Sequence, residues 1–524
     1  MATARLARIA SSHVRCGPRF SGNGSRWLVW AARGSLALTA LACTDPTTGG
    51  EGHTFAIAPD TVTGWVGETV LFRVTADVGT EVGSPRDLTW VVADPGIAVF
   101  VETGDAGALV LVRGSGTTVV TVRAGALTAR ADLTGIAEGE LLTYHTLGWG
   151  ALIQSPSLDE FGNLHMLPIW PRDNAGPTPG QTLLSLYPDL TLRWEAPRRP
   201  SLAMFAPAVG ADGALYFSAG DYTAAYSLDG SQLWEDTTHT SGETAPAIGP
   251  GGRVYVAGRP LLGSPETWAI AAYDPAGTRL FRTPAFGDEI KVGLTIVADS
   301  VVVGADRGNR AFGLSLSGAL LWVDTLPSPV GFFSPSVGAD GRTVYFPGAE
   351  HVVAVDALTG ERRWVWQAEG RWPLTPVVDG VGVLYVQTQA AVTALNPDGT
   401  VKWSADSLGG RHYYSVGGAP ALTDAGVLYV GCRIDLCAVR TADGSVRWRR
   451  PLPFPGPPGP IMVARDSSIV FVTLGLLPYG GGLTDSTRVV RLRGRFPLAD
   501  APWPVEGGNL RRTRRAPPAM AAGR

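Results

Sequence analysis

Charged residues, histidine and cysteine are scarce in this chain of 524 residues, and a helical pattern is lacking after residue 50. Only 17% of the residues are charged and the formal net charge is −3, so the composition does not favour nucleic acid as a partner. The histidines stand singly without metal-ligand spacing, and the chain has neither a G-x-S-x-G motif nor a phosphate-binding loop. We therefore expect no catalytic residue and no metal site.

The first 42 residues have the pattern of an export signal. Six arginines and no acidic residue occupy the first 33 positions, and a short apolar run, Leu36 to Ala42, precedes Cys43. Such a run is too short to remain in a bilayer as a spanning helix, so we expect residues 1–42 to be removed as a signal peptide. The ending Ala40-Leu41-Ala42-Cys43 resembles the bacterial lipobox, although leucine is usual where Ala40 stands. The resemblance implies lipidation of Cys43 and a flexible tether over 43–52, with ordinary secretion as the alternative.

A repeated pattern dominates the chain after residue 145. Seven segments each contain a strand, a turn with Gly and Asp or Asn, and a second strand that ends in an aromatic residue; Ala354 to Trp364 is the clearest copy. Their period is about 40 residues, which is typical of four-stranded propeller blades. A further strand with an Asp-Gly turn precedes most copies, as in Ala206 to Phe217. The alternation of apolar residues predicts antiparallel hairpins and an all-β protein.

The order of these motifs, SPAV-x-x-DG-x-x-Y followed by A-x-D-x-x-TG-x-x-x-W, resembles the pyrroloquinoline-quinone-type repeat of quinoprotein-like β-propellers. The resemblance spans residues 145–510 and implies that fold. In the family, the last aromatic of each repeat packs between neighbouring blades. The docking aromatics implied for this chain are Trp194, Trp234, Phe281, Trp322, Trp364, Trp403 and Trp448, with Phe281 departing from the Trp pattern.

The end of the propeller is less regular. Seven modules are clear, and a degenerate module from Pro460 to Arg493 lacks a closing Trp. Because a ring leaves protected edges only when it closes, we favour eight blades over seven. The segment from Trp503 to Thr513 resembles an element found at the ends of such propellers, and we expect it to seal the first and last blades. The basic stretch 511–524 is predicted to be a disordered tail.

Residues 53–136 form a separate module. Alternating apolar strands separated by turn residues predict a β-sandwich. The motifs VGE-T-V, W-x-x-x-DP-x-x-A-x-V and G-T-x-V-x-T-V resemble a bacterial immunoglobulin-like domain of group 2, with Trp90 as its core tryptophan. In that family such modules serve as spacers or adhesive units. We expect residues 137–144 to be a solvated linker to the propeller.

Cysteine usage is consistent with export. Of four cysteines, Cys16 is lost with the signal and Cys43 is the lipidation candidate, which leaves Cys432 and Cys437. These two flank a short turn between predicted strands, so a structural disulfide is favoured. Two free thiols remain the alternative, and a metal site would need more ligands.

These features favour an exported, lipid-anchored and monomeric scaffold protein without enzymatic activity, which binds a protein or a glycan at the cell envelope through a propeller face. Otherwise it is a secreted protein. An envelope assembly factor, similar to the propeller lipoprotein of the outer-membrane barrel assembly machinery, is one alternative.

The second alternative is an oxidoreductase that depends on pyrroloquinoline quinone. In the resembled enzymes the quinone lies over calcium, often above a disulfide between adjacent cysteines; no two cysteines are adjacent here, so we expect no cofactor. The acids that could meet at the central funnel are Asp288, Glu289, Asp306, Glu350 and Glu369. A cluster of Asp, Asn and Arg around a calcium-sized gap would favour the enzyme, and an open polar funnel the binding protein.

Overall fold

The computed structural model describes residues 54–77, 87–149, 156–168, 182–199, 205–219, 222–238, 240–241, 244–259, 268–284, 288–290, 293–330, 333–370, 372–409, 418–454, 457–473, 486–509 and 511–515. These residues form β-strands and turns, apart from two short 3-10 helices, η1 (Pro250–Gly252) and η2 (Asp406–Leu408). Across the same residues, no helix is long and apolar enough to cross a membrane. The expectation of an all-β chain is confirmed.

A β-sandwich comes first in the described chain. Its strands are β1 (Thr54–Ala58), β2 (Thr61–Trp65), β3 (Thr69–Asp77), β4 (Thr89–Val92), β5 (Ala98–Gly104), β6 (Gly107–Val112), β7 (Gly116–Ala124) and β8 (Leu127–Ile136). One sheet has the order β1-β3-β6-β5 and the other β2-β8-β7-β4. Alternating side chains such as Phe72, Val110 and Leu133 fill the space between the sheets. Trp90, expected at the centre, is half-buried on the edge strand β4, where it meets Phe100.

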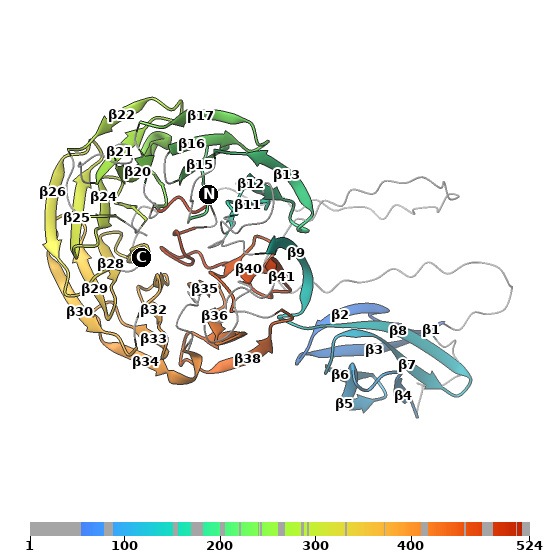
Figure 1. Ribbon diagram of the computed structural model, residues 1–524. Coiled ribbons are helices and arrows are strands. Elements are labelled where there is room, and N and C mark those ends of the chain that lie inside the picture. The colour runs from blue at the N-terminus through green and yellow to red at the C-terminus, as the bar shows by residue number, and fades with distance from the viewer. Residues whose placement is uncertain are drawn as a thin grey trace, which may run out of the picture.

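Eight further sheets follow, which we number in order around the ring of Figure 1. Sheet 1 contains β10 (Ser157–Leu158), β11 (Leu164–Met166), β12 (Thr182–Leu186) and β13 (Leu192–Pro197); sheet 2 contains β14 (Ala208–Val209), β15 (Ala214–Ala219), β16 (Tyr222–Ser227) and β17 (Gln232–Asp236). Sheet 3 contains β18 (Thr240–Ser241), β19 (Ala247–Ile248), β20 (Val254–Arg259), β21 (Ala269–Tyr273) and β22 (Arg279–Arg282); sheet 4 contains β23 (Thr295–Val297), β24 (Val301–Ala305), β25 (Arg310–Ser315) and β26 (Leu320–Thr325).

The second half of the ring repeats this order. Sheet 5 contains β27 (Ser336–Val337), β28 (Thr343–Pro347), β29 (His351–Asp356) and β30 (Arg362–Gln367); sheet 6 contains β31 (Val377–Val378), β32 (Leu384–Gln387), β33 (Val392–Leu395) and β34 (Val401–Ala405). Sheet 7 contains β35 (Ala421–Leu422), β36 (Val427–Cys432), β37 (Asp435–Arg440) and β38 (Val446–Pro451); sheet 8 contains β39 (Met462–Val463), β40 (Ile469–Thr473), β41 (Ser486–Leu492) and β9 (Leu141–Trp149).

Each sheet runs from a short first strand near the axis to an outermost fourth strand on the rim (Figure 1). The inner strands are apolar on both faces because neighbouring sheets cover them: every residue of Ala214–Ala219 is buried. The fourth strands have one face in solvent, and Val446–Pro451 is largely exposed. This burial pattern and the radial arrangement are those of a β-propeller.

The ring closes through sheet 8, which takes its fourth strand from the other end of the chain. Strand β9 follows the sandwich directly and pairs antiparallel with β41. The predicted linker 137–144 is therefore wrong in part, because Leu141 already lies in the ring. Ala137, Glu138 and Gly139 are buried rather than solvated, since they lie between the sandwich and the ring.

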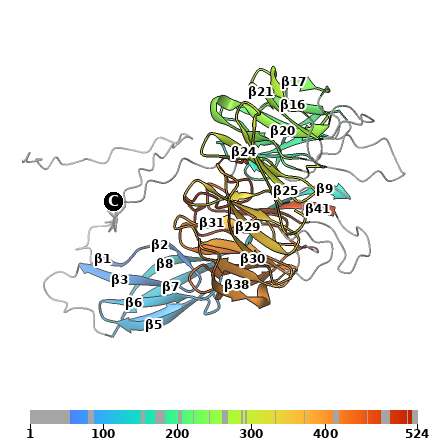
Figure 2. The same ribbon diagram turned by 90° about the vertical axis from the view of Figure 1, so that its left-hand side faces the viewer.

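The two faces of the ring differ. Since the strands of each sheet alternate in direction, the turns from strand 1 to 2 and from 3 to 4 lie on one face, which we call the turn face. The connections from strand 2 to 3 and from sheet to sheet lie on the opposite face, the loop face. In sheets 1, 3 and 8, the described ends of strands 2 and 3 on the loop face, such as Met166 and Thr182, are the furthest apart in sequence. The sandwich precedes a fourth strand and lies on the turn-face side, next to β38 in Figure 2.

Candidate functional site

The aromatic residues of the fourth strands lie between neighbouring sheets. Trp322 is 8% exposed and packs on Gly360, a turn glycine of the next sheet with a φ of +76°. A Cβ built on Gly360 would lie 2.7 Å from Trp322 Cδ2, so only glycine fits there. The Trp322 Nε1–H donates to Ala357 O at 2.7 Å.

Six other aromatics repeat this contact. The pairs are Trp194 with Gly230, Trp234 with Gly277, Phe281 with Gly318, Trp364 with Gly399, Trp403 with Gly444, and Trp448 with Gly139. Phe281 keeps the packing contact but has no N–H to donate. Trp448 Nε1 has no acceptor among the described residues.

The degenerate eighth module is split between two distant parts of the chain. Gly139, with a φ of +79°, precedes β9 by the spacing at which the turn glycines precede the other fourth strands. Thr143 pairs with Arg491 in the register in which Trp364 pairs with Ala354. Thr143 therefore stands in sheet 8 where the other sheets have their tryptophan or phenylalanine.

The junction between sheets 8 and 1 replaces the tryptophan–glycine contact by other residues. The turn of sheet 1 has Leu190 at a φ of +67° where the other turns have glycine, and its side chain is 2% exposed in the core between the sheets. Arg491 donates to Pro188 O, which corresponds to the carbonyl that accepts from tryptophan elsewhere, and it also pairs with Asp466. Leucine thus fills the space and arginine supplies the hydrogen bond.

A buried tyrosine–aspartate contact supports several turns. In sheet 6, the Tyr385 hydroxyl donates to Asp379 at 2.9 Å. In sheet 1 this place is taken by His165, whose Nε2 lies 3.2 Å from Asp159. Burial alone would raise the pKa of Asp159, but hydrogen bonds with His165 and Asn163 outweigh it and lower this pKa to about 2. Burial lowers the pKa of His165.

The centre of the ring is occupied by the chain itself. Residues 498–509 and 511–515, which we call the axial segment, follow sheet 8 and lie against the innermost strands of the other sheets. Arg512 and Arg514 are 2% and 1% exposed, so the expectation of a disordered tail from residue 511 is wrong for 511–515. The cost of burying these two positive charges is offset in part by Glu506, whose carboxylate lies 3.4 Å from Arg512. The segment crosses the axis instead of sealing only the first and last blades.

Two of the acids considered for a calcium site use their carboxylates in ion pairs. Asp306 is 2% exposed, pairs with Arg310 at 2.8 Å and accepts from the Asp288 amide; Glu289 pairs with Arg307 at 2.9 Å. Glu350 and Glu369 lie on the next sheet and accept hydrogen bonds through their backbone carbonyls. Within the described ranges, no three His, Cys, Asp or Glu residues are grouped to hold a metal. The described acids are therefore held in separate contacts rather than gathered in one cluster.

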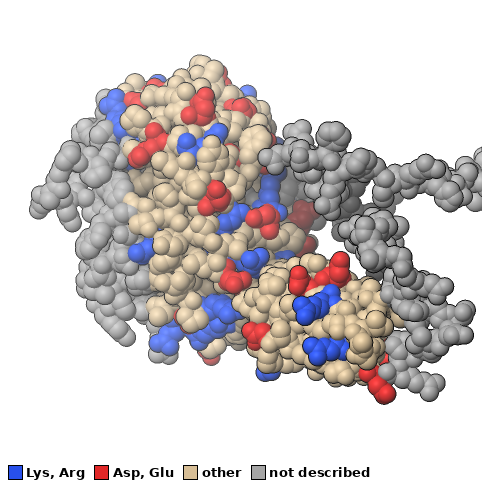
Figure 3. All heavy atoms as spheres, turned by 90° about the vertical axis from the view of Figure 1, so that its right-hand side faces the viewer, with Lys and Arg blue, Asp and Glu red and all other residues tan. Residues whose placement is uncertain are grey.

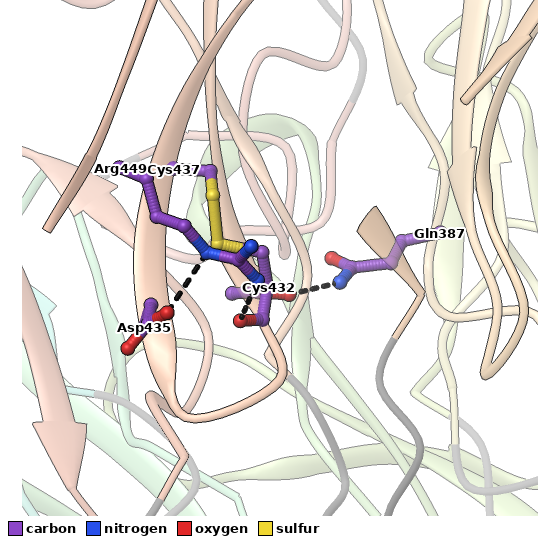
Figure 4. Close-up of a disulfide and its surroundings, with 6 residues drawn as sticks. Gln387, Cys432, Asp435, Cys437 and Arg449 are labelled. Carbon is purple, nitrogen blue, oxygen red and sulfur yellow. Dashed lines mark hydrogen bonds and ion pairs between the residues drawn. A yellow bond between two sulfur atoms is a disulfide. The ribbon is translucent and has the colours of Figure 1, made fainter. Parts of the chain in front are cut away.

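Cys432 and Cys437 form a disulfide at the end of the hairpin of β36 and β37, with their Cα atoms 5.9 Å apart (Figure 4). Both cysteines are fully buried. Arg449 pairs with Asp435 at 2.8 Å beside the bridge, and Gln387 of sheet 6 donates to Gly431 O. The bridge fixes one hairpin of sheet 7 near the loop face.

A buried carboxylate joins the sandwich to the ring, and no sequence motif pointed to this role. Glu138 is 8% exposed, accepts from the Tyr429 hydroxyl and lies 3.6 Å from Arg447. Further along, Arg495 pairs with Glu68 of the sandwich. These contacts couple the two domains on the turn face.

The outer surface carries charges of both signs. Figure 3 shows acidic and basic side chains interspersed over the ring and the sandwich on the side that it presents. Several of the described basic side chains near the surface pair with a carboxylate, as Arg362 does with Asp324. Cys43, the signal and the tether, together with His239 and His412, lie outside the described residues.

Comparisons with known proteins identify the repeat. A model of a PQQ-type repeat family, described as outer membrane protein assembly factor BamB, matches residues 218–365 and 315–468. Among solved structures, the chain is similar to BamB from Moraxella catarrhalis, at 13% identity and a TM-score of 0.45, over 67% of this chain and all of that one. No curated protein matches the chain. The prediction of PQQ-type repeats in a propeller is confirmed.

Proposed function

We propose that the protein is an exported, lipid-anchored scaffold whose eight-bladed ring binds a protein partner at the cell envelope through the loop face. The observation that carries this proposal is the separation of the two faces. The strand ends that the longest connections within sheets join lie on the loop face, while the sandwich lies on the turn-face side. Loops on a rigid scaffold are where binding residues concentrate.

The position of the lipidation candidate agrees with this orientation. Cys43 precedes the first strand of the sandwich by a short stretch of chain. A lipid on Cys43 would therefore hold the membrane on the side of the sandwich, which acts as an immunoglobulin-like spacer. The buried contacts of Glu138 keep the spacer and ring in one orientation, so the loop face points away from the anchor.

The matched family supports a protein partner over a glycan. Its description names an outer membrane protein assembly factor, which is a protein that acts on other proteins. The second candidate, an oxidoreductase dependent on pyrroloquinoline quinone, is disfavoured by the occupied axis and by the ion pairs of the candidate acids. Calorimetric titration with the quinone and calcium, together with a dye-linked oxidation assay, tests that candidate directly.

Site-specific photo-crosslinking compares the two faces in the native host. A photoreactive residue replaces Trp372, which lies on the loop face between sheets 5 and 6 and is 41% exposed. The matched control replaces Val381, which is 78% exposed on a turn-face turn of sheet 6. We expect a reproducible crosslinked protein from position 372 and none from 381; equal crosslinking from both faces, or none from 372 and its loop-face neighbours, would reject the proposal.

Membrane attachment is tested with Cys43→Ala. We expect the wild-type chain to fractionate with membranes and to incorporate labelled fatty acid, and the variant to be released and unlabelled. Identical fractionation of the two chains would show that Cys43 is not the anchor.

A further inference from the structure

We infer that the centre of the ring is a binding site for a polypeptide main chain, which the chain fills with its own residues 503–509 and 511–515. The inference concerns the axis rather than the loop face, and it holds or fails independently of the proposed function. It starts from the innermost strands, whose inner edges have no neighbouring strand within their own sheets.

Five equivalent backbone amides on these edges are satisfied by the axial segment. Each belongs to the second residue of a first strand in sheets 2, 3, 4, 6 and 7, except that in sheet 4 it is the middle residue of three. The N–H groups donate to carbonyl oxygens at 2.8 or 2.9 Å: Val209 to Arg511, Ile248 to Thr513, Ile296 to Arg514, Val378 to Trp503 and Leu422 to Pro504. Donors at equivalent places around a ring recognise main-chain carbonyls, so the ligand class is a polypeptide main chain, here one that turns at Gly507 and Gly508.

Side chains of the segment anchor it in a defined register. Trp503 is fully buried and belongs to the core cluster that sheets 3 to 6 share. Arg512 Nε donates to Pro156 O of the strand entry to sheet 1 at 2.9 Å, and Arg514 Nε donates to Ser334 Oγ at the entry to sheet 5 at 3.2 Å. The guanidinium of Arg514 also lies 5.6 Å from the centroid of the Phe205 ring. Sheets on opposite sides of the ring therefore hold the same short segment.

The segment makes these contacts as a ligand would, because it forms no strand of any sheet. It contacts seven sheets that precede it by long stretches of sequence, and its internal contacts are local, between residues 505 and 514. The closing strand of the ring is β9 and not this segment. Weakening the segment should therefore vacate the axis without opening sheet 8.

The test uses the full chain in two forms and a synthetic fluorescent peptide of residues 498–515. The variant carries Trp503→Ala, Arg512→Ala and Arg514→Ala, with Glu506→Gln added so that no buried carboxylate is left unpaired. The matched control carries Arg511→Ala and Arg515→Ala, whose side chains make only partly exposed ion pairs. Fluorescence anisotropy measures peptide binding, and hydrogen exchange follows the five inner amides.

We expect the peptide to bind the variant at least about tenfold more tightly than the unaltered chain or the control, because only the variant offers a weakly held axis. A peptide with the same three alanines should not bind. In the unaltered chain the five amides should exchange as slowly as the amides between second and third strands, and in the variant at least about tenfold faster.

Two results would overturn the inference. One is a folded variant that binds no peptide and keeps the slow exchange of the five amides. The other is fast exchange of these amides in the unaltered chain while the strand ladders stay protected, which needs no variant at all. If the multiple variant does not fold, Trp503→Ala alone, which leaves the buried charges paired, repeats the titration with the same two outcomes.

Discussion

Replacement of Trp322 tests what holds neighbouring sheets together. The side chain is almost fully buried against Gly360 and donates to Ala357 O. Trp322→Ala removes nearly all of that buried area and leaves a cavity, so we expect a loss of about 3–5 kcal/mol in the free energy of unfolding. Trp322→Phe keeps most of the packing but leaves the Ala357 carbonyl without its donor, for a loss of about 1–3 kcal/mol.

The assay is urea unfolding followed by circular dichroism, with the midpoint compared at constant slope. Trp372→Ala is the control, since this exposed tryptophan lies in the connection from sheet 5 to sheet 6 and contacts no turn glycine. Its replacement should change the free energy of unfolding by no more than about 0.5 kcal/mol. A loss for Trp322→Ala no larger than that for Trp372→Ala would refute the reasoning.

A double-mutant cycle isolates the contact itself. Gly360→Ala in the unaltered chain brings a Cβ to 2.7 Å from the Trp322 ring, in addition to the cost of a positive φ. With Trp322→Ala only the conformational cost remains, about 1 kcal/mol, so the two substitutions should be less harmful together than the sum of both. Additive losses would show that the ring and the glycine do not interact.

Three further predictions concern other contacts. Reduction of the disulfide, or Cys432→Ala with Cys437→Ala, should cost about 2 kcal/mol because the closed loop is short, measured by unfolding with and without reductant; no difference would show that the bridge is absent. Because burial lowers the pKa of His165 from 6.5, protonation favours the unfolded chain and stability should fall as the pH drops below 6.5. Stability should fall again below pH 3.8, because the folded pKa of Asp159 is about 2 and its carboxylate is protonated first in the unfolded chain. His165→Tyr should abolish only the first loss in urea midpoints measured from pH 7.5 to 3, and equal curves for both chains would contradict this. Leu190→Gly should destabilise by about 2–4 kcal/mol although its φ is positive, because the leucine fills space that tryptophan fills elsewhere; a gain in thermal unfolding temperature would contradict it.

Much of the fold could be predicted because it is local. The turn glycine and the aromatic recur at a fixed spacing within each repeat, so the sequence shows both partners of every regular junction, such as Trp364 and Gly399 in consecutive repeats. The junction that closes the ring could not be predicted in this way. Its parts, Thr143, Leu190 and Arg491, lie far apart in sequence, and none is the aromatic or the glycine of the repeat pattern. The missing closing tryptophan of the last module was the one local sign that a strand had to come from elsewhere.

The candidate site was harder to predict for a similar reason. The basic residues after 510 have the composition of a solvated tail, and composition does not reveal that Arg512 and Arg514 are buried. Their burial depends on acceptors supplied by sheets 1 and 5, and on a carboxylate at Glu506. Likewise, Glu138 was expected in a solvated linker, but it accepts from Tyr429, a residue almost 300 positions away.

The repeat and the order of strands and turns within it could be predicted from the sequence, because they follow from alternation and from spacing over a few tens of residues, and the resemblance of the repeats implied that the aromatics pack between blades. The closure of the ring and the occupant of its centre became visible only in the folded chain. Closure requires a strand from the N-terminal side to meet the last three strands, and the axis is filled because the inner edges of the sheets leave backbone amides that need acceptors. Both features arise only when the ring is closed, and neither can be read from a single repeat.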